Sequence, residues 1–181
     1  MKVLLHACCG PCSCYSVPRL RKEGLEVHGY FFNPNIHPYT EYLRRLETMK
    51  QYAEQVYLPV IYDDYPFEDY FRKVVYREGE RCHNCYAMRL QRTAATARRL
   101  GFDAFTTTLL YSKFQKHEDI REIAGRLARE YNIDFYYLDL REGWKEGIKI
   151  SKEMELFRQQ YCGCVYSEWE RYKGGKANAK G

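Results

Sequence analysis

Apolar residues gather in five stretches of the chain, and segments with helical periodicity lie between them. The first stretch, KVLLHA at 2–7, is continuously apolar, which is typical of a strand buried on both faces. Four later stretches are rich in β-branched and aromatic residues and also predict strands. They lie at 26–32, 56–64, 103–112 and 134–140.

The intervening segments predict helices. The clearest one follows the fourth strand, where one face carries Ile120, Ile123, Ala124, Leu127, Ala128 and Tyr131. The others are expected at 15–23, 38–55, 66–76, 83–100 and 145–160. This alternation predicts an open, Rossmann-like parallel α/β sheet with helices on both faces. We expect one domain over residues 1–173 and a flexible basic tail at 174–181.

The length of 181 residues is enough for one domain with a substantial core. No apolar run approaches the roughly 18 to 20 residues of a membrane-spanning helix. The start, MKVLLHACC, lacks the apolar core and the cleavage site of a signal peptide. We therefore expect a cytoplasmic protein without membrane contact. The net charge of +5 is compatible with a nucleic-acid partner but does not identify one.

Eight cysteines form three tight clusters. The clusters consist of Cys8, Cys9, Cys12 and Cys14, then Cys82 and Cys85, then Cys162 and Cys164. Structural disulfides are rare in a reducing cytosol, so the clusters indicate metal or redox chemistry. Because the first cluster follows a parallel strand, we expect the clusters to meet at the carboxyl edge of the sheet.

The cysteine spacing predicts a four-thiolate metal site. Cys82 and Cys85 form a C-x-x-C next to a helix, and Cys8 with Cys9 would complete the site. Zinc and iron–sulfur clusters both accept four thiolates, and the surplus thiols favour iron–sulfur. A disulfide within Cys162-Gly163-Cys164 would be strained and easily reduced, which suits the transfer of two electrons.

Other polar residues allow two interpretations each. Asp63 and Asp64 end the third predicted strand, either as acid/base groups or metal ligands, or as a helix-capping turn before Pro66. Basic residues also gather on two predicted helices, namely Arg89, Arg92, Arg98 and Arg99, then Arg44, Arg45 and Lys50. Such runs are usually solvated helix faces, although arginines beside the cysteines would suit a phosphate backbone.

Five motifs are distinctive, and they span nearly the whole chain. They are HACCGPCS at 6–13, FFNPNIHPYTEYLRR at 31–45, RCHNCYAMRL at 81–90, TTTLLYSKFQKHEDI at 106–120 and QQYCGCVYS at 159–167. In this order they resemble the QueH family of epoxyqueuosine reductases. The resemblance implies a cobalamin-independent oxidoreductase that reduces the epoxide of epoxyqueuosine in tRNA to the alkene of queuosine, with loss of water.

The resemblance also implies a HUP-related fold, a 4Fe-4S cluster with an adjacent iron, tRNA as partner and an electron donor that it does not identify. Carried over by motif, the cluster ligands are Cys8, Cys9, Cys82 and Cys85. Cys162 and Cys164 become a catalytic redox pair or ligands of the second iron, with Cys12 as a helper. These residues are the seven candidate metal ligands, and Cys14 lies outside the family pattern.

Two other functions compete with this one. An ATP-dependent tRNA sulfur-transfer enzyme of the HUP lineage would carry a glycine-rich phosphate loop after the first strand. Here that position reads ACCGPCS, with one glycine followed by proline, which disfavours ATP binding. A non-catalytic RNA-binding module stabilised by zinc is the other alternative, and iron with acid-labile sulfide would distinguish the reductase from it.

Overall fold

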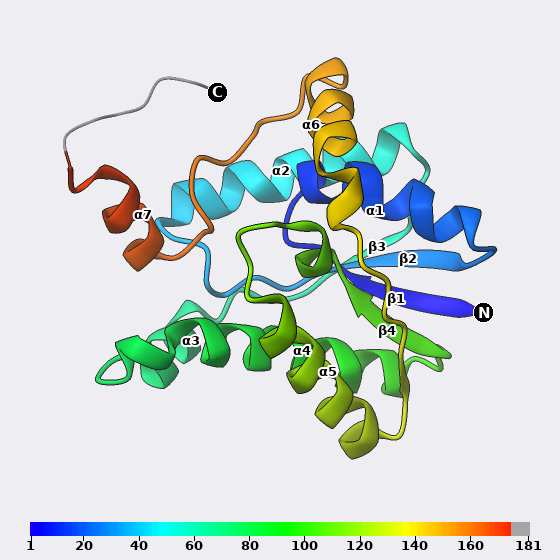
Figure 1. Cartoon of the computed structure of the whole chain (residues 1–181), viewed down its shortest axis with the longest axis horizontal. Coiled ribbons are helices and arrows are strands. Elements are labelled where there is room, and N and C mark those ends of the chain that lie inside the picture. Colours follow the sequence, from blue (N-terminus) through cyan, green and yellow to red (C-terminus); the bar gives the residue numbers. More distant parts are fainter. Residues whose placement is uncertain (175–181) are drawn as a thin grey trace.

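The computed structural model describes residues 1–174 and contains one open, entirely parallel sheet in the order β3-β2-β1-β4-β5 (Figure 1). Its strands are β1 (Lys2–His6), β2 (Glu26–Phe31), β3 (Val60–Tyr62), β4 (Ala104–Thr107) and β5 (Asp134–Phe135). The expected parallel α/β fold is confirmed. The single domain over 1–173 stays a prediction, and the tail expected at 174–181 lies, from residue 175 on, outside the described residues.

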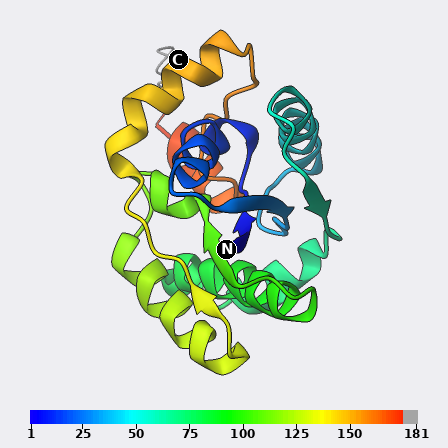
Figure 2. The ribbon, with the colours of Figure 1, turned by 90° about the vertical axis from the view of Figure 1, so that its right-hand side faces the viewer.

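Helices cover both faces of the sheet (Figure 2). They are α1 (Gly10–Lys22), α2 (Tyr39–Gln55), α3 (Phe67–Val74), α4 (Arg81–Arg99), α5 (His117–Tyr131), α6 (Trp144–Glu153) and α7 (Val165–Tyr172). One face carries α1, α2 and α6, and the other carries α3, α4 and α5 (Figure 1). Within residues 1–174, no helix combines the length and the apolar character that crossing a membrane requires.

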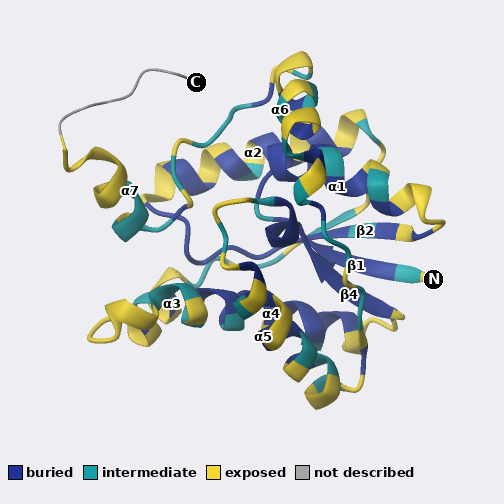
Figure 3. Cartoon of the chain, viewed as in Figure 1, coloured by how far each residue is buried: buried dark blue, intermediate teal, exposed yellow. Residues whose placement is uncertain are grey.

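Two apolar layers sandwich the sheet (Figure 3). Successive residues of β1 alternate between them, so that Leu4 packs in one layer while Val3 and Leu5 pack in the other. The strand is therefore buried on both faces, as its continuous apolar run predicts.

The winding of the chain creates a site at the ends of β1 and β4. The chain proceeds outward from β1 through β2 to β3, then returns to the opposite side of β1 for β4 and β5. Ligands in such sheets bind at this switch point, beyond the carboxyl ends of the strands. The two strand ends are joined there, because the Cys8 amide donates a hydrogen bond to the Thr108 hydroxyl at 3.1 Å.

The two helices whose first turns carry cysteines, α1 and α4, both begin earlier than the sequence predicted. Helix α1 begins at Gly10 instead of residue 15, because Pro11 is tolerated in a first turn whose N–H groups lack helical partners. Cys12 therefore lies on a helix. Helix α4 begins at Arg81 instead of residue 83, which places the C-x-x-C pair within its first turns.

The predicted strands are shorter in the structure, and the predicted last helix is divided. The strand expected at 103–112 ends at Thr107 and continues as a 3-10 turn, Thr108–Tyr111. The strand expected at 134–140 is limited to Asp134 and Phe135, which pair with Ala104 and Phe105. The helix expected at 145–160 ends at Glu153, and Glu155 then adopts a left-handed conformation with φ of 53°. The separate helix α7 was not predicted.

Candidate functional site

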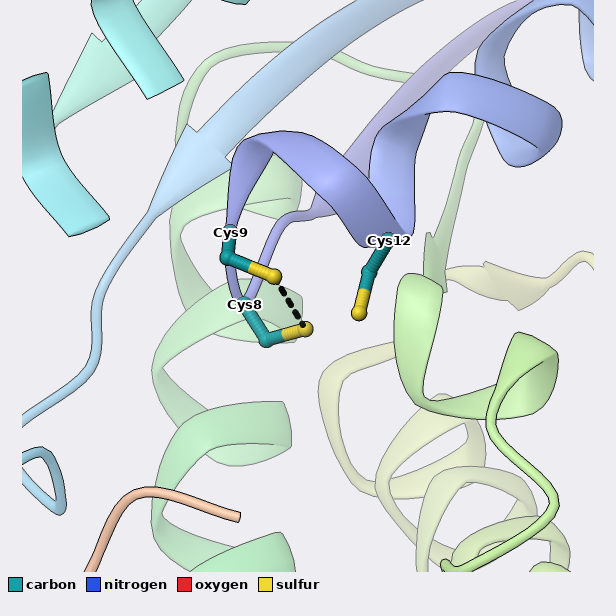
Figure 4. Close-up of side chains that lie close together, drawn as sticks. All are labelled: Cys8, Cys9 and Cys12. Atoms are coloured by element: carbon teal, nitrogen blue, oxygen red, sulfur yellow. Dashed lines mark hydrogen bonds between the residues drawn. The ribbon is translucent and has the colours of Figure 1, made fainter. Parts of the chain in front are cut away.

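Three thiols converge directly after β1 (Figure 4). Cys8 and Cys9 leave the strand, and Cys12 occupies the first turn of α1. Their sulfur atoms all lie within 4.8 Å of one another, and the Cys8 and Cys9 sulfurs are 3.8 Å apart. Thiolates at this spacing suit a zinc ion or an iron–sulfur cluster. We call these three residues the thiol triad.

Close packing against α2 fixes the start of α1 and hence the thiol triad. A Cβ atom on Gly10 would lie 2.8 Å from the carbonyl oxygen of Thr48 in α2. Glycine therefore lets the two helices approach at this point. The Ser13 hydroxyl donates to the Cys9 carbonyl at 3.0 Å and fixes the same turn.

The environment of the thiol triad favours one thiolate even without metal. Hydrogen bonds from the Cys12 and Cys9 thiols lower the pKa of Cys8 well below its ordinary value. The Thr108 hydroxyl adds a further donor to the Cys8 sulfur at 3.3 Å. Burial raises the pKa of Cys9, and hydrogen bonding to Cys8 raises the pKa of Cys12. Cys8 is therefore the thiol of this group that ionises first.

A buried guanidinium contacts the second cysteine pair and acts on Cys8 of the thiol triad through its charge. Arg89 of α4 is 2% exposed and donates to Asn33 Oδ1 at 3.0 Å, to His6 Nε2 at 3.3 Å and to Cys85 Sγ at 3.7 Å. None of these partners is a carboxylate. Burial, followed by the charge of Arg89, lowers the pKa of His6 to about 3, so this imidazole is neutral. The cation thus complements thiolates.

The second cysteine pair lies at the start of α4. Cys85 is buried and Cys82 is half-buried. Burial raises the pKa of Cys85 to about 12, Arg89 lowers it, and the nearby thiol of Cys162 raises it again. In the part of the chain that the structure describes, the metal-sized group contains only Cys8, Cys9 and Cys12. The assignment of Cys82 and Cys85 to the same cluster stays a prediction.

The third cysteine pair lies on an irregular segment that distant residues hold in place. Buried Arg45 of α2 donates to the carbonyl oxygens of Cys162 and Tyr161 at 2.9 and 3.0 Å, and to Glu41 at 2.8 Å. The His37 amide donates to the Gly163 carbonyl at 2.8 Å. We call residues 161–164 the C-x-C segment. Arg45 faces this segment and not solvent, so it is not free to contact a phosphate backbone.

The two cysteines of the C-x-C segment differ in their surroundings. Cys162 is exposed, and its sulfur accepts a hydrogen bond from Gln115 Nε2 at 3.3 Å. Cys164 caps α7, where its sulfur accepts from the Ser167 amide at 3.4 Å. Both are free thiols in the structure. Their use as a redox pair or as ligands of a second iron stays a prediction.

A cavity of about 490 Å³ opens onto the thiols. Its wall includes Cys8 and Cys12 of the thiol triad together with Cys162 of the C-x-C segment. The carboxyl edge of the sheet thus brings the first and third cysteine clusters to one cavity, whereas Cys82 and Cys85 are not part of its lining. The geometry is that of a cavity whose wall carries potential metal ligands.

Two amide side chains contact the thiols although the sequence analysis assigned them no role. Gln159 Nε2 lies 3.1 Å from the Cys9 sulfur and 3.6 Å from the Cys12 sulfur, and Gln115 contacts Cys162. The position of Gln159 three residues before Cys162 was the available signal. Asp63 belongs to no such group, because it accepts from Arg92 at 2.9 Å and from the Asp64 amide at 2.8 Å, and it does not cap α3, whose N-cap is Pro66 without a side-chain hydrogen bond.

Comparison with known proteins agrees with the fold and identifies the family. A structure described as a predicted subunit of tRNA methyltransferase from Methanocaldococcus jannaschii aligns with a TM-score of 0.54 at 16% identity, over 83% of this chain and 76% of that chain, which shows a shared fold alone. The Dehalococcoides mccartyi protein named Epoxyqueuosine reductase QueH is 41% identical over 98% of this chain and 97% of its own length.

Proteins of the same name from Histophilus somni and Thermotoga maritima are 36% and 35% identical, over 99% and 93% of this chain and 77% and 91% of theirs. The sequence model of the family described as Epoxyqueuosine reductase QueH matches residues 3–170. The resemblance carried by the five motifs is thereby confirmed. This chain belongs to the epoxyqueuosine reductase QueH family of oxidoreductases.

Proposed function

We propose that this protein reduces the epoxide of epoxyqueuosine in cytoplasmic tRNA to the alkene of queuosine. The observation that carries the proposal is the thiol triad, two of whose members, Cys8 and Cys12, line a cavity large enough for a nucleoside. The reaction breaks both carbon–oxygen bonds of the epoxide and forms one carbon–carbon double bond. It consumes two electrons and two protons, and the oxygen leaves as water.

The donor set fits an iron–sulfur cluster. The compact group consists of thiols alone, and soft thiolates favour iron–sulfur clusters or zinc over hard cations. In the proposal, Cys8, Cys9 and Cys12 hold a 4Fe-4S cluster, and Cys85 is the candidate for a fourth ligand because Arg89, which contacts Cys85, also lowers the pKa of Cys8 through its charge. When bound, the cluster supplies electrons from an external donor, one at a time.

In this proposal, the remaining cysteines supply the second electron that reduction of the epoxide requires. Cys162 lines the same cavity as Cys8 and Cys12. Cys164 lies close enough to Cys82 that its charge raises the pKa of Cys82. We assign Cys162 and Cys164 either to a second iron or to a redox-active dithiol. A dithiol that becomes a disulfide releases two electrons and two protons.

Polar side chains around the thiols orient the reacting group and balance charge. Arg89 compensates the negative charge of several thiolates in a buried place, where an unpaired anion would be costly. The amides of Gln115 and Gln159 reach the cavity beside the sulfurs and can donate to a substrate oxygen.

The test is metal analysis together with conversion. Protein purified without oxygen is analysed for iron, acid-labile sulfide and zinc, then incubated with epoxyqueuosine-containing tRNA and dithionite, and the nucleosides are identified by mass spectrometry. The proposal predicts iron with sulfide and a product that lacks one oxygen atom. Zinc without sulfide and an intact epoxide would instead support the RNA-binding module.

A further inference from the structure

We propose that the cavity above the thiol triad is a nucleotide pocket, in which Trp144 stacks on an extruded base and Arg158 and Arg171 contact its phosphates. That the base is epoxyqueuosine rests on the proposed function. The existence of a nucleotide pocket rests on the cavity itself, through its charge, its aromatic wall and its size.

The charged side chains in the cavity wall are all positive. Within the part of the chain that the structure describes, the lining contains Arg89, Arg158 and Arg171 but no aspartate or glutamate. Carboxylates are otherwise abundant, since the whole chain carries 24 of them against 29 lysines and arginines. Arg89 is buried beside the thiols, whereas Arg158 is half-buried and Arg171 is exposed. The two outer arginines are therefore available to an anionic ligand such as phosphate.

An aromatic group forms another part of the cavity wall. The rings of Tyr111 and Trp144 lie 5.1 Å apart, and Phe114 packs edge-on against Trp144 at 5.5 Å. Tyr111 is fixed from two sides, because its hydroxyl donates to the Trp144 carbonyl at 3.0 Å and a Cβ atom on Gly147 would come within 2.4 Å of that hydroxyl. Phe114 remains 83% exposed at the cavity mouth. Fixed rings of this kind bind bases by stacking.

The size and depth of the cavity select one nucleotide over a duplex. A volume of about 490 Å³ holds a small molecule but no paired helix. Cys8, Cys12 and Cys162 line the cavity, so a reacting group must enter it to reach the thiols. A base that reacts inside such a pocket has to leave the RNA stack, as in other enzymes that act on bases.

The chain contains two tryptophans, and this makes a matched fluorescence test possible. Trp169 of α7 is 61% exposed, lies outside the cavity lining and packs against Lys173 at 4.2 Å. Metal-loaded Trp169→Phe protein retains Trp144 as its sole tryptophan. Metal-loaded Trp144→Phe protein retains Trp169 as its sole tryptophan. An anticodon stem-loop carrying epoxyqueuosine is expected to quench Trp144 emission, relative to the same protein without RNA, and to leave Trp169 emission nearly unchanged.

Binding affinity gives a second measurement. Trp144→Ala should raise the Kd of the stem-loop by about 5- to 100-fold, the usual effect of losing one base stack, and Trp144→Phe should restore most of the affinity. Arg158→Gln and Arg171→Gln should each lower the slope of log Kd against log salt by about 0.7 to 0.9. Arg99→Gln is the control, because Arg99 is exposed at the C-terminal end of α4, away from the cavity.

The outcomes separate the pocket from the reaction. Equal quenching of both tryptophans, or unchanged affinity of Trp144→Ala, overturns the pocket even if the wild-type protein reduces the epoxide. Selective quenching of Trp144 with the expected loss of affinity supports the pocket, even if the metal-loaded protein leaves the epoxide intact and the reductase proposal fails.

Discussion

The thiol triad and the C-x-C segment reach the same cavity by different structural means. The thiol triad belongs to the continuous backbone from β1 into α1, and two of its three residues, Cys9 and Cys12, are buried. The C-x-C segment has no regular structure, and its carbonyls are held by Arg45 and by the backbone of His37. The thiol triad lies on regular backbone that distant residues such as Thr108 contact, whereas the C-x-C segment lies on irregular backbone that distant residues hold.

This difference assigns different tasks to the two regions. A rigid group of buried thiols suits permanent metal binding, because its geometry is formed by the fold itself. An exposed Cys162 on a segment held by side chains is better suited to a step that occurs during turnover. The predictions below test that division of tasks, beginning with the largest expected effect.

Substitution in the thiol triad should remove the metal. Cys9→Ser replaces a buried sulfur that lies within 4.8 Å of the Cys8 and Cys12 sulfurs. Changes outside the ligand sphere already cost about 10- to 100-fold in metal affinity, so loss of a ligand should cost more. Iron analysis and the visible absorption of protein purified without oxygen are the measurements.

Cys14→Ser is the matched control for this substitution. Cys14 lies on α1, like Cys12, but it packs in the other apolar layer, with Val3 and Val17. Its sulfur donates a hydrogen bond to the Gly10 carbonyl at 3.5 Å. Iron content should remain close to that of the wild type. Retention of iron by Cys9→Ser, together with loss of iron in Cys14→Ser, would reverse the assignment of the metal site.

Removal of Arg45 should destabilise the fold and release the C-x-C segment. Arg45→Met leaves the buried Glu41 carboxylate unpaired, a change that typically costs about 3 to 5 kcal/mol. The double variant Glu41→Gln/Arg45→Met avoids the unpaired charge, so it should be more stable than Arg45→Met. Cys162 should react faster with iodoacetamide in the double variant, while iron at the thiol triad is retained.

Arg72→Met provides the comparison for Arg45, because Arg72 forms an exposed ion pair with Asp69 that is worth at most about 1 kcal/mol. Urea unfolding and mass spectrometry of alkylated peptides measure both effects. An unchanged alkylation rate of Cys162 in the double variant would mean that the segment holds its conformation without Arg45.

Acid should weaken the support of the C-x-C segment through His37. Burial lowers the pKa of His37 to about 4, below the value of about 6.5 expected in the unfolded chain. As pH falls below 6.5, the unfolded chain binds a proton that the folded chain does not, so stability decreases until about pH 4. The decrease between pH 6.5 and pH 5 should be about 2 kcal/mol.

His37→Phe should remove this part of the pH dependence. The aromatic ring keeps the packing against Tyr70 and Phe71, whose ring centroids lie 5.0 and 4.7 Å from His37. Urea midpoints of both proteins at pH 7 and pH 5 provide the measurement. If wild type and variant lose equal stability on acidification, His37 does not titrate as described.

The sheet was predictable from the sequence where one residue pattern determines the structure. The continuous apolar run of β1 reflects burial on both faces, and this property is visible in the sequence. Strand length was less predictable, because β5 pairs with β4 over Asp134 and Phe135 alone, and pairing depends on both strands. The early start of α1 was also missed, although Pro11 is compatible with a first turn.

The cysteines of the site were predictable, but the residues that hold them were not. Clustered thiols after a parallel strand indicate metal or redox chemistry on their own. The contact of Arg45 with Cys162 joins residues 117 positions apart, and its position in a charged run suggested a solvated helix face. Arg89 was likewise grouped with surface arginines, whereas the structure buries it among Asn33, His6 and Cys85.

The division of tasks is tested most directly by measuring cluster content and conversion side by side in Cys162→Ala and Cys164→Ala proteins. Each variant is purified without oxygen, analysed for iron and acid-labile sulfide, and given epoxyqueuosine-containing tRNA with dithionite in a single-turnover reaction. We predict retained sulfide and 4Fe-4S absorption, with little or no loss of the epoxide oxygen. Conversion close to that of the wild type in both variants would contradict the account and would make the C-x-C segment a structural element.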